Sequence, residues 1–245
     1  MDFTFGIITD GNSEDRINRI IDSIEITMSD DYEVIIIGGN HIKREKTRVI
    51  PFYEDQGPAR VSEKKNIITR ESKYENIVYL HDYIEFLPEW HSEFKKFGNN
   101  FNVCMNRIVN PDMTRYRDWC LWMDDASGKV KDWNYLIPYN ITTLSKMMYI
   151  SGAYWVAKKN FMLENQLNEN LRWGQGEDVE WSIRVREITD FSINEKSVVR
   201  LIKQKDRIFN EITEYEISNI IKMSDYHNIN AYDDLIKNHI SKWIK

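Results

Sequence analysis

The stretch YEVIIIGGN, residues 32–40, is the part of the sequence that decides the fold class. Its centre is an unbroken apolar run rich in β-branched isoleucine, which favours a strand, and two glycines close it. A strand that is apolar on both faces is typical of the middle of a parallel sheet covered by helices on both sides. The stretch therefore predicts an α/β protein.

The segment that precedes this strand has the same organisation. Residues 3–11 (FTFGIITDG) have the composition of a strand and end in a polar turn. Ser13, followed by two acids, is suited to begin a helix. The helix is predicted because isoleucines recur on one helical face, at Ile17, Ile20, Ile21 and Ile24.

The segments that follow continue the alternation. Residues 47–54 (TRVIPFYE) predict a weaker strand, residues 61–72 (VSEKKNIITRES) a helix, and residues 76–80 (NIVYL) a further strand. Strands that alternate with helices in this way indicate a parallel sheet with helices packed on its faces.

Three of the predicted strands end in polar or glycine residues, at 9–11, 38–40 and 81–83. In open parallel sheets, ligands bind beyond the carboxyl ends of the strands. We therefore expect these three strand ends to converge on one crevice.

The second half is less regular. After a helix at 89–98 and a strand at 101–109, residues 110–147 show little periodicity, and long irregular stretches are usually functional or mobile. The tryptophans of 119–133 are interpreted either as core or as a platform for a sugar. The remaining elements are a strand that continues into a short helix at 147–162, a glycine-rich loop that opens a helix at 171–188, a strand at 197–202, and two amphipathic helices in the tail.

Composition narrows the function. The chain has 245 residues, of which 42% are hydrophobic, and a formal net charge of -6, which argues against a general nucleic-acid binder. Cys104 and Cys120 are too few for a disulfide framework or a zinc site. No apolar run approaches the roughly 18 residues of a membrane span, and no basic segment precedes an apolar one at the start. We therefore expect a cytoplasmic protein without a transmembrane segment.

Four features occur in a distinctive order. They are the opening strand, turn and helix at 5–24, the segment EKKNI at 63–67, the segment YLHDY at 79–83, and the paired segments SGAYWVAKKNF and LRWGQGEDVEWSIRV, which begin at Ser151 and Leu171. In this order the sequence resembles family 2 glycosyltransferases of the GT-A fold, in the nucleotide-diphospho-sugar transferase superfamily.

The resemblance implies a mostly parallel, Rossmann-like central sheet flanked by helices. It places the transferase domain at 1–205 and a helical extension, packed on that domain, at 206–245. The implied activity is that of a hexosyltransferase in glycan biosynthesis. Such an enzyme transfers a sugar, with inversion, from a nucleotide-diphosphate donor (a UDP-sugar is expected) to a hydroxyl of a glycan or other acceptor.

The resemblance also assigns catalytic roles. Asp178 is implied to be the general base that takes the proton of the acceptor hydroxyl, and Glu177 orients the acceptor or the loop. The glycines at 174 and 176 allow the tight turn before the helix. The positive end of the helix dipole is expected to favour the ionised form of Asp178.

Further residues are implied to bind the two substrates. Trp173 and Arg184 are assigned to the acceptor, with Trp173 suited to stack on a sugar. Lys65 takes the place of an arginine that contacts the diphosphate or the base. The remaining residues of the donor site are Thr9, Asp10, Gly38, Gly39, Asp82 and Gly152.

The metal site departs from the family. GT-A enzymes usually hold a divalent cation with an Asp-x-Asp motif, and this chain has His81-Asp82-Tyr83 instead. Asp82 and His81 are the expected ligands, with His227 as a possible third; an imidazole ligand suits Mn²⁺ better than Mg²⁺. In the metal-free alternative, Lys65 and the arginines of 107–117 carry the charge of the leaving group.

Two other functions stay open at this stage. A sugar-1-phosphate nucleotidyltransferase would share the fold, but residues 9–16 (TDGNSEDR) lack its glycine-rich phosphate loop. A non-catalytic protein that binds carbohydrate or nucleotide would explain the altered motif at 81–83. Structurally, Asp82 could cap its strand, and the acids at 177 and 178 could be ordinary first-turn residues.

Overall fold

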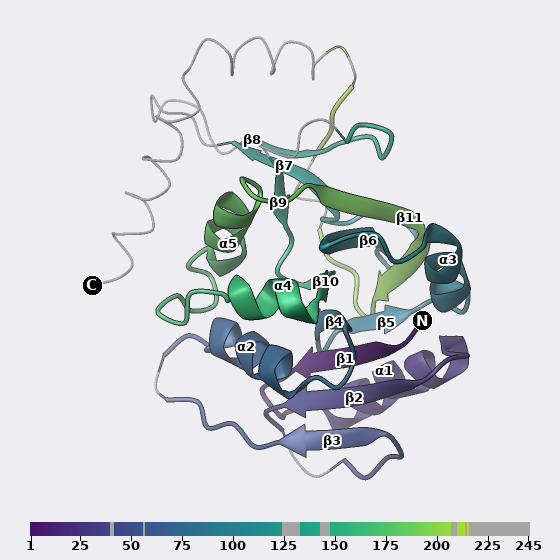
Figure 1. The fold of residues 1–245 in the computed structure, drawn as a ribbon, viewed down its shortest axis with the longest axis vertical. Coiled ribbons are helices and arrows are strands. Elements are labelled where there is room, and N and C mark those ends of the chain that lie inside the picture. Colours follow the sequence, from purple (N-terminus) through teal and green to yellow (C-terminus); the bar gives the residue numbers. More distant parts are fainter. Residues whose placement is uncertain are drawn as a thin grey trace.

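The computed structural model of the chain describes residues 1–39, 42–55, 57–123, 133–142, 148–206, 210–213 and 215. Its main feature is an eight-stranded sheet of order β3-β2-β1-β4-β10-β6-β11-β5 (Figure 1). The strands of this sheet are β1 (Phe3–Ile8), β2 (Tyr32–Ile37), β3 (Thr47–Ile50), β4 (Asn76–His81), β5 (Ile84–Phe86), β6 (Val103–Val109), β10 (Tyr154–Lys158) and β11 (Phe191–Leu201).

Most of this sheet is parallel, as the sequence predicts. Strands β1 to β4 run in one direction, β10 is antiparallel to both of its neighbours, β11 is parallel to β6, and β5 closes the edge antiparallel to β11. The inner strand β2 is buried along its last four residues, which explains its unbroken apolar run. The predicted mostly parallel α/β sheet is confirmed.

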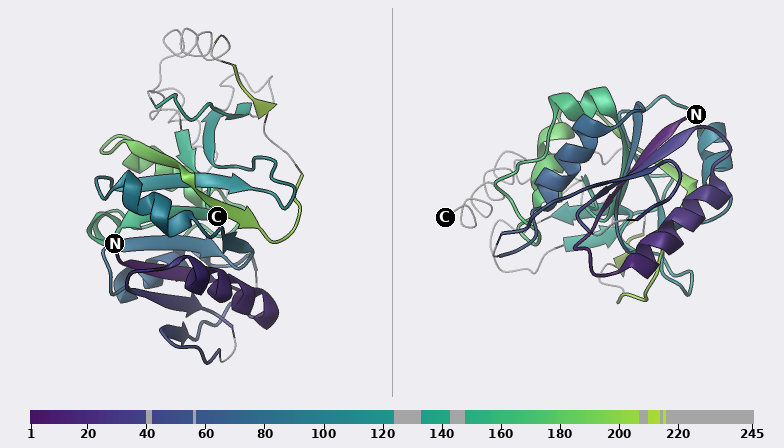
Figure 2. Two further views of the ribbon diagram at one scale, coloured as in Figure 1. Left: turned by 90° about the vertical axis from the view of Figure 1, so that its right-hand side faces the viewer. Right: turned by 90° about the horizontal axis from the view of Figure 1, so that it is seen from below.

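Helices cover both faces of the large sheet. Helices α1 (Glu14–Thr27) and α3 (Trp90–Phe97) lie on one face, and α2 (Val61–Glu71) and α4 (Lys159–Glu164) lie on the other (Figures 1 and 2). A fifth helix, α5 (Glu177–Val185), packs near the end of the sheet. The isoleucines predicted for one face of α1 are all buried, so the helical spacing read from the sequence is the packing face.

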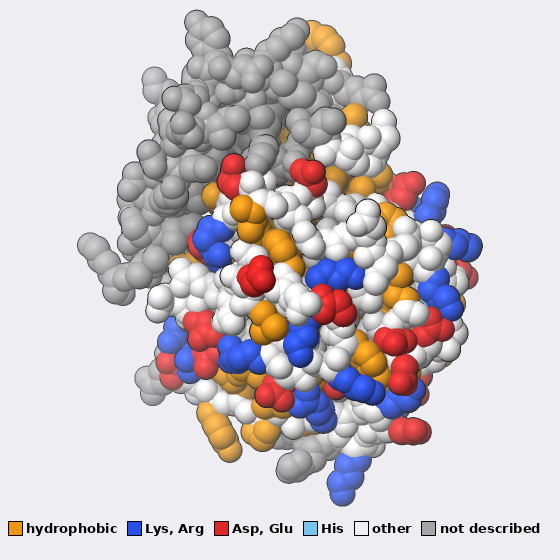
Figure 3. Space-filling model, in the orientation of Figure 1, with side chains coloured by type: hydrophobic (Ala, Val, Ile, Leu, Met, Phe, Trp, Pro, Cys, Tyr) orange, Lys and Arg blue, Asp and Glu red, His pale blue; other side chains and the backbone are white. Residues whose placement is uncertain are grey.

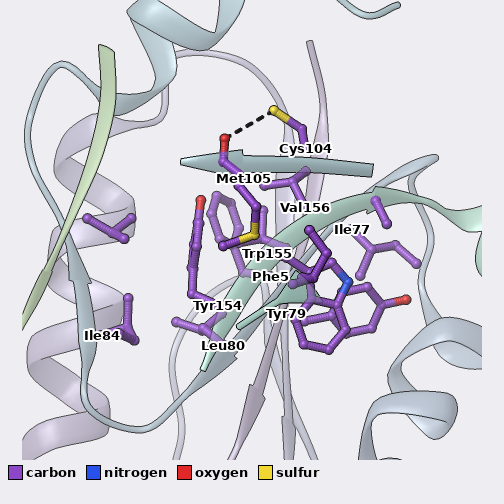
Figure 4. Packing of buried hydrophobic residues seen from close by; sticks show 14 of the residues in the cluster. Phe5, Ile77, Tyr79, Leu80, Ile84, Cys104, Met105, Tyr154, Trp155 and Val156 are labelled. Carbon is purple, nitrogen blue, oxygen red and sulfur yellow. Dashed lines mark hydrogen bonds between the residues drawn. The ribbon is translucent and has the colours of Figure 1, made fainter. Parts of the chain in front are cut away.

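Aromatic side chains pack in the core where β4 meets β10. The rings of Tyr79 and Trp155 stack with their centroids 4.8 Å apart, and Figure 4 shows Tyr154 of β10 and Met105 of β6 in the same cluster. Cys104 is also buried here, and burial raises the pKa of its thiol. An uncharged buried thiol is an inert core residue.

The irregular region holds secondary structure that the sequence did not reveal. Strands β7 (Trp119–Met123), β8 (Trp133–Leu136), β9 (Met148–Ile150) and β12 (Asn210–Glu211) form a second sheet of order β12-β8-β7-β9 (Figures 1 and 2). The expectation of an irregular stretch from 110 to 147 was therefore wrong at β7 and β8. These strands are short and none alternates strictly between apolar and polar residues, so their pairing depends on distant partners.

The segment at 147–162 also differs from the prediction. It contains two strands, β9 and β10, which belong to different sheets and are separated by residues 151–153. The strand β5, which immediately follows β4, was not predicted either, because three residues are too few to show a period.

The tail can be followed only in part. The two amphipathic helices predicted at 211–227 and 231–245 lie mostly outside the described part of the chain, and so does His227. Glu211, where the first of them was expected to begin, belongs to the strand β12 instead. Within the described part, β12 pairs with β8, which attaches the beginning of the expected extension to the small sheet. The division at residue 205 stays a prediction.

Two observations concern the exterior. Among the described residues, no helix has the length and apolar character needed to cross a membrane. On the face shown in Figure 3, acidic and basic side chains are interspersed over the lower part of the molecule rather than gathered by sign.

Candidate active site

The carboxyl ends of three parallel strands meet as expected. Ile8, the last residue of β1, is in register with Ile37 of β2 on one side and with His81 of β4 on the other. The hydroxyl of Thr9 then donates a hydrogen bond to Oδ2 of Asp82 over 2.8 Å. The polar groups that end β1 and β4 are thus partners in one site.

The two glycines after β2 allow close approach to β1. Both have positive φ angles, 86° at Gly38 and 90° at Gly39. A Cβ atom on Gly38 would lie 2.4 Å from the carbonyl oxygen of Thr9, so no side chain fits there. The same carbonyl accepts a hydrogen bond from Nζ of the buried Lys64 over 2.8 Å.

Asp82 already has a cationic partner. Nη2 of Arg16, from α1, lies 3.3 Å from Oδ2 of Asp82, the oxygen that also accepts the Thr9 hydroxyl. Asp10, by contrast, is exposed and turned toward its own loop, where it accepts the N–H of Asn12 over 2.9 Å. This hydrogen bond lowers the pKa of Asp10. Thr9 and Asp82 are therefore brought together, and Asp10 stands apart.

Asp178 lies at the start of α5 and is held by backbone groups. Its Oδ2 accepts the N–H of Gly152 over 2.7 Å, and its Oδ1 accepts the N–H of Val179 over 3.0 Å. A Cβ atom on Gly152 would lie 2.9 Å from Oδ2, so only glycine leaves room for the carboxylate. Gly176, with a φ of 72°, forms the left-handed turn from which α5 begins.

The Asp82 and Asp178 regions adjoin through the start of β10. Gly152 precedes Ala153, whose carbonyl oxygen accepts the backbone N–H of His81 over 3.1 Å. Asp178 is therefore linked to the end of β4, next to Asp82, by two hydrogen bonds, one to Gly152 and one between Ala153 and His81. Both carboxylates contribute to raising the pKa of Tyr83, although burial is the main cause.

Lys65 lies beneath this site rather than in it. Its side chain is fully buried, Nζ donates to the carbonyl oxygen of Gly152 over 2.9 Å, and Nζ lies 4.5 Å from the centroid of the Trp155 ring. Burial lowers the pKa of Lys65, and the charges of Glu177 and Asp178 oppose that effect. As the side chain is placed, it supports Gly152 and the acids and presents no surface to a diphosphate.

Glu177 is the more enclosed of the two adjacent acids. Only 6% of the residue is exposed. Burial, together with the charge of Asp178, raises its pKa to about 7, and Lys65 partly offsets this. Near neutral pH Glu177 is therefore partly protonated, and in that form its carboxyl group can donate a hydrogen bond.

The residues predicted for the acceptor are separated. The side chain of Trp173 is 62% exposed, beside the glycines of the loop that opens α5. Arg184 is engaged on the outer side of α5, where its guanidinium binds Glu180 over 2.6 Å and the carbonyl oxygen of Gln166 over 2.8 Å. Trp173 is available for stacking, whereas Arg184 is engaged by a neighbour on its own helix and by the carbonyl oxygen of Gln166 in the preceding loop.

The described residues do not fit a bound divalent cation. They contain no group of three or more His, Cys, Asp or Glu side chains that could hold one. Nε2 of His81 is enclosed and has no hydrogen-bond partner among them, and Asp82 is paired with Arg16. Burial lowers the pKa of His81 well below its usual range, and the charges of Lys65 and Lys205 add to this effect. The positive charges of Lys65 and Lys205 would also repel a bound cation.

Two cationic residues at the site belong to loops beyond β6 and β11. Nζ of Lys205 lies 3.6 Å from the centroid of the Tyr83 ring, and Arg117 is hydrogen-bonded to the hydroxyl of Tyr116. The arginines of 107–117 were expected near this site from the sequence, whereas Lys205 was not. No local signal marks Lys205; the parallel pairing of β11 with β6 places it at the same edge as the other strand ends.

A hollow of about 540 Å³ opens at the opposite edge of the sheet. Asn102, Lys158 and Asp190 are among its lining residues, close to the start of β6, the end of β10 and the start of β11. None of the residues predicted for catalysis or binding lines it. The chemistry expected from the sequence is therefore at the carboxyl edge, away from this hollow.

Comparison with solved structures identifies the architecture. Residues 1–349 of TarS from S. aureus match with a TM-score of 0.57 and 10% identity, over 82% of this chain. GalNAc-T7, solved with UDP, GalNAc and Mn²⁺, matches with a TM-score of 0.58 and 13% identity, over 84% of this chain. Both are glycosyltransferases of the GT-A type. The chain has the GT-A fold.

The matches cover only part of each of these two structures, which limits what can be inferred about this chain from them. The chain spans 60% of the TarS structure and 44% of the GalNAc-T7 structure. Comparison with protein families finds none that matches the chain, and no curated protein matches it by sequence. The GT-A fold is thus shown by structure, at identities that do not carry function.

Proposed function

We propose that this chain is an inverting glycosyltransferase that moves a sugar from a nucleoside-diphosphate donor to a hydroxyl, with Asp178 as the general base. The observation that carries the proposal is the setting of the Asp178 carboxylate. Uncharged N–H groups of Gly152 and Val179 hold it at the start of α5, beside the strand ends where GT-A folds are expected to bind a donor.

The setting of Asp178 favours proton transfer. Backbone N–H groups fix the orientation of the carboxylate without pairing it to a cation, and a general base must be both oriented and ionised. Lys65 and Glu177 act as positioning residues, because Lys65 holds Gly152 from below and Glu177 is enclosed at the first position of the same helix.

The proposed step is a single displacement. The acceptor oxygen bonds to the anomeric carbon as the bond from that carbon to the diphosphate oxygen breaks. The acceptor proton passes to Asp178, and the electron pair of the broken bond leaves with the nucleoside diphosphate. Attack from the face opposite the leaving group inverts the anomeric carbon.

On the donor side, Thr9, Asp82 and the backbone of Gly38 and Gly39 surround the place where the nucleoside would bind. A UDP-sugar is the proposed donor, and the UDP in the GalNAc-T7 structure supports this choice. Trp173 is the proposed stacking surface for a glycan or other hydroxyl acceptor.

The test measures both halves of the reaction separately. The wild-type chain is incubated with a panel of UDP-sugars and glycan acceptors, release of UDP is followed, and UDP affinity is measured by calorimetry. Asp178→Asn keeps an oxygen for Gly152 but removes the base, so turnover should fall by about a hundredfold or more while UDP binding persists. Glu180→Gln, on the same helix but paired with Arg184 at the surface, is the matched control and should keep turnover.

The result separates two functions. Full turnover in Asp178→Asn would show that Asp178 is not the general base. UDP binding by the wild type without turnover of any donor would instead favour a non-catalytic protein that binds nucleotide or carbohydrate.

A further inference from the structure

Two cationic side chains share one aromatic surface at the candidate active site. Nζ of Lys205 lies 3.6 Å from the centroid of the Tyr83 ring and 5.7 Å from that of Tyr116, and Cζ of Arg117 lies 5.4 Å from the Tyr116 ring. Tyr83 directly follows Asp82 at the end of β4. The two cations are therefore next to the strand ends where the donor is proposed to bind.

The backbone holds Lys205 in this position. Its N–H donates to Oδ1 of Asn110 over 3.0 Å, which joins the loop after β11 to the loop after β6. Tyr116 is attached to β6, because its N–H donates to the carbonyl oxygen of Ile108 over 2.8 Å. The cationic pair is thus built on two parallel strands of the sheet rather than on a free surface loop.

The two cationic side chains lie close enough for the charge of one to affect the other. Burial and the neighbouring charge of Arg117 both lower the pKa of Lys205, which means that the two cations repel each other. Within the described part of the chain, Lys205 has no carboxylate within salt-bridge distance, and Asp82 acts on it only from farther away. Two half-buried like charges are unfavourable until an anion lies between them.

Arg117 lies over the Tyr116 ring and also interacts electrostatically with Asp178, the proposed base. Tyr149, Tyr116 and Asp178 raise its pKa and outweigh the effect of burial, so the guanidinium stays charged within reach of the base region. A guanidinium and an ammonium together suit a diphosphate, because the planar donors can bind two oxygens and the ammonium adds a compact charge.

We propose that Lys205 and Arg117 bind the diphosphate of the donor and hold its negative charge as it leaves, in place of a divalent cation. This inference rests on the proposed glycosyltransferase function. It accounts for the altered His81-Asp82-Tyr83 motif, because Asp82 is paired with Arg16 and the ring of Tyr83 lies against Lys205, so that cationic side chains are next to the place of the leaving group.

The experiment is a calorimetric titration of the full chain with UDP, GDP and dTDP, each in EDTA and in MnCl₂. The nucleotide that binds best is then titrated into three variants. Lys205→Met removes the charge, Lys205→Arg keeps it, and Lys203→Met removes an exposed charge two residues away as the matched control. Thermal unfolding of each variant shows that it is folded.

We expect the nucleoside diphosphate to bind equally well in EDTA and in MnCl₂. Lys205→Met should weaken it by about tenfold or more, the loss of one charged contact, and should weaken the corresponding monophosphate less. Lys205→Arg should restore most of the affinity, and Lys203→Met should leave it unchanged.

Two other outcomes are distinguishable. Binding that needs Mn²⁺ and is insensitive to Lys205→Met would overturn this inference and leave the proposed transferase function standing. No binding of any of the three nucleotides, with or without Mn²⁺, would overturn both.

Discussion

Asp82 and Asp178 have identical side chains and belong to the same candidate site, but the groups around the two carboxylates differ in charge. Asp82 has an arginine 3.3 Å away and a threonine hydroxyl on the same oxygen. Asp178 has backbone N–H groups on both oxygens. The arginine at Asp82 brings a counter-charge, whereas the backbone donors at Asp178 orient the carboxylate without adding a charge. Side-chain type alone therefore does not assign a role; the partners do.

The largest effect is expected when the Asp178 region is distorted without removing its charge. In Gly152→Ala the new Cβ would lie 2.9 Å from Oδ2 and 3.2 Å from Cβ and Cγ of Asp178, so the carboxylate must move. Small displacements of reacting groups cost about a hundredfold in rate, and we expect turnover to fall by that order.

Gly152→Ala is checked by UDP release from a UDP-sugar, alongside UDP affinity by calorimetry. Affinity should stay close to that of the wild type, because Asp82 and Thr9 are untouched. Turnover at the wild-type rate would show that the contact between Gly152 and Asp178 is dispensable. The different surroundings of Asp82 and Asp178 would then not explain which of them acts as the base.

A second variant tests the support beneath the Asp178 region. Lys65→Met removes the buried ammonium that binds the Gly152 carbonyl and faces Glu177 and Asp178. Breaking a buried interaction of this kind costs about 3 kcal/mol of the free energy of unfolding. Lys196→Met, at an exposed position of β11, is the control and should change stability little.

Urea unfolding of both lysine variants checks this prediction. Equal midpoints for Lys65→Met and Lys196→Met would mean that the buried ammonium contributes no net stability and that the acids of α5 do not depend on it.

A more gradual effect is expected from pH. The pKa of Glu177 is raised from 4.5 to about 7 in the folded chain. Between these values the folded state binds more protons than the unfolded state at this position, so the contribution of Glu177 to stability falls as pH rises from about 4.5 to 7. The slope from one group is at most about 1.4 kcal/mol per pH unit.

Thermal unfolding across this pH range, for the wild type and Glu177→Gln, measures the contribution. The glutamine variant should lose less stability than the wild type as pH rises. Glu180→Gln, which changes a carboxylate paired with Arg184, should keep the wild-type slope. Parallel curves for the wild type and Glu177→Gln would show that Glu177 does not hold its proton near neutral pH.

The fold could be predicted well where the signal is local. The unbroken apolar run of β2 and the isoleucine face of α1 identified a parallel sheet with covering helices, because burial on two faces or on one helical face leaves a readable pattern. The small sheet could not be predicted, since β7, β8 and β9 are short and none of them alternates strictly between apolar and polar residues.

For the candidate site, the sequence by itself determined which polar groups end the parallel strands, and hence that Thr9 and Asp82 lie at one edge, because parallel strands align their carboxyl ends. Only the tertiary structure decided what surrounds them. It buried Lys65 under Gly152, turned Arg184 outward, and brought Lys205 from beyond β11 onto the ring of Tyr83. These placements depend on contacts between distant segments, and such contacts leave no period or spacing in the chain.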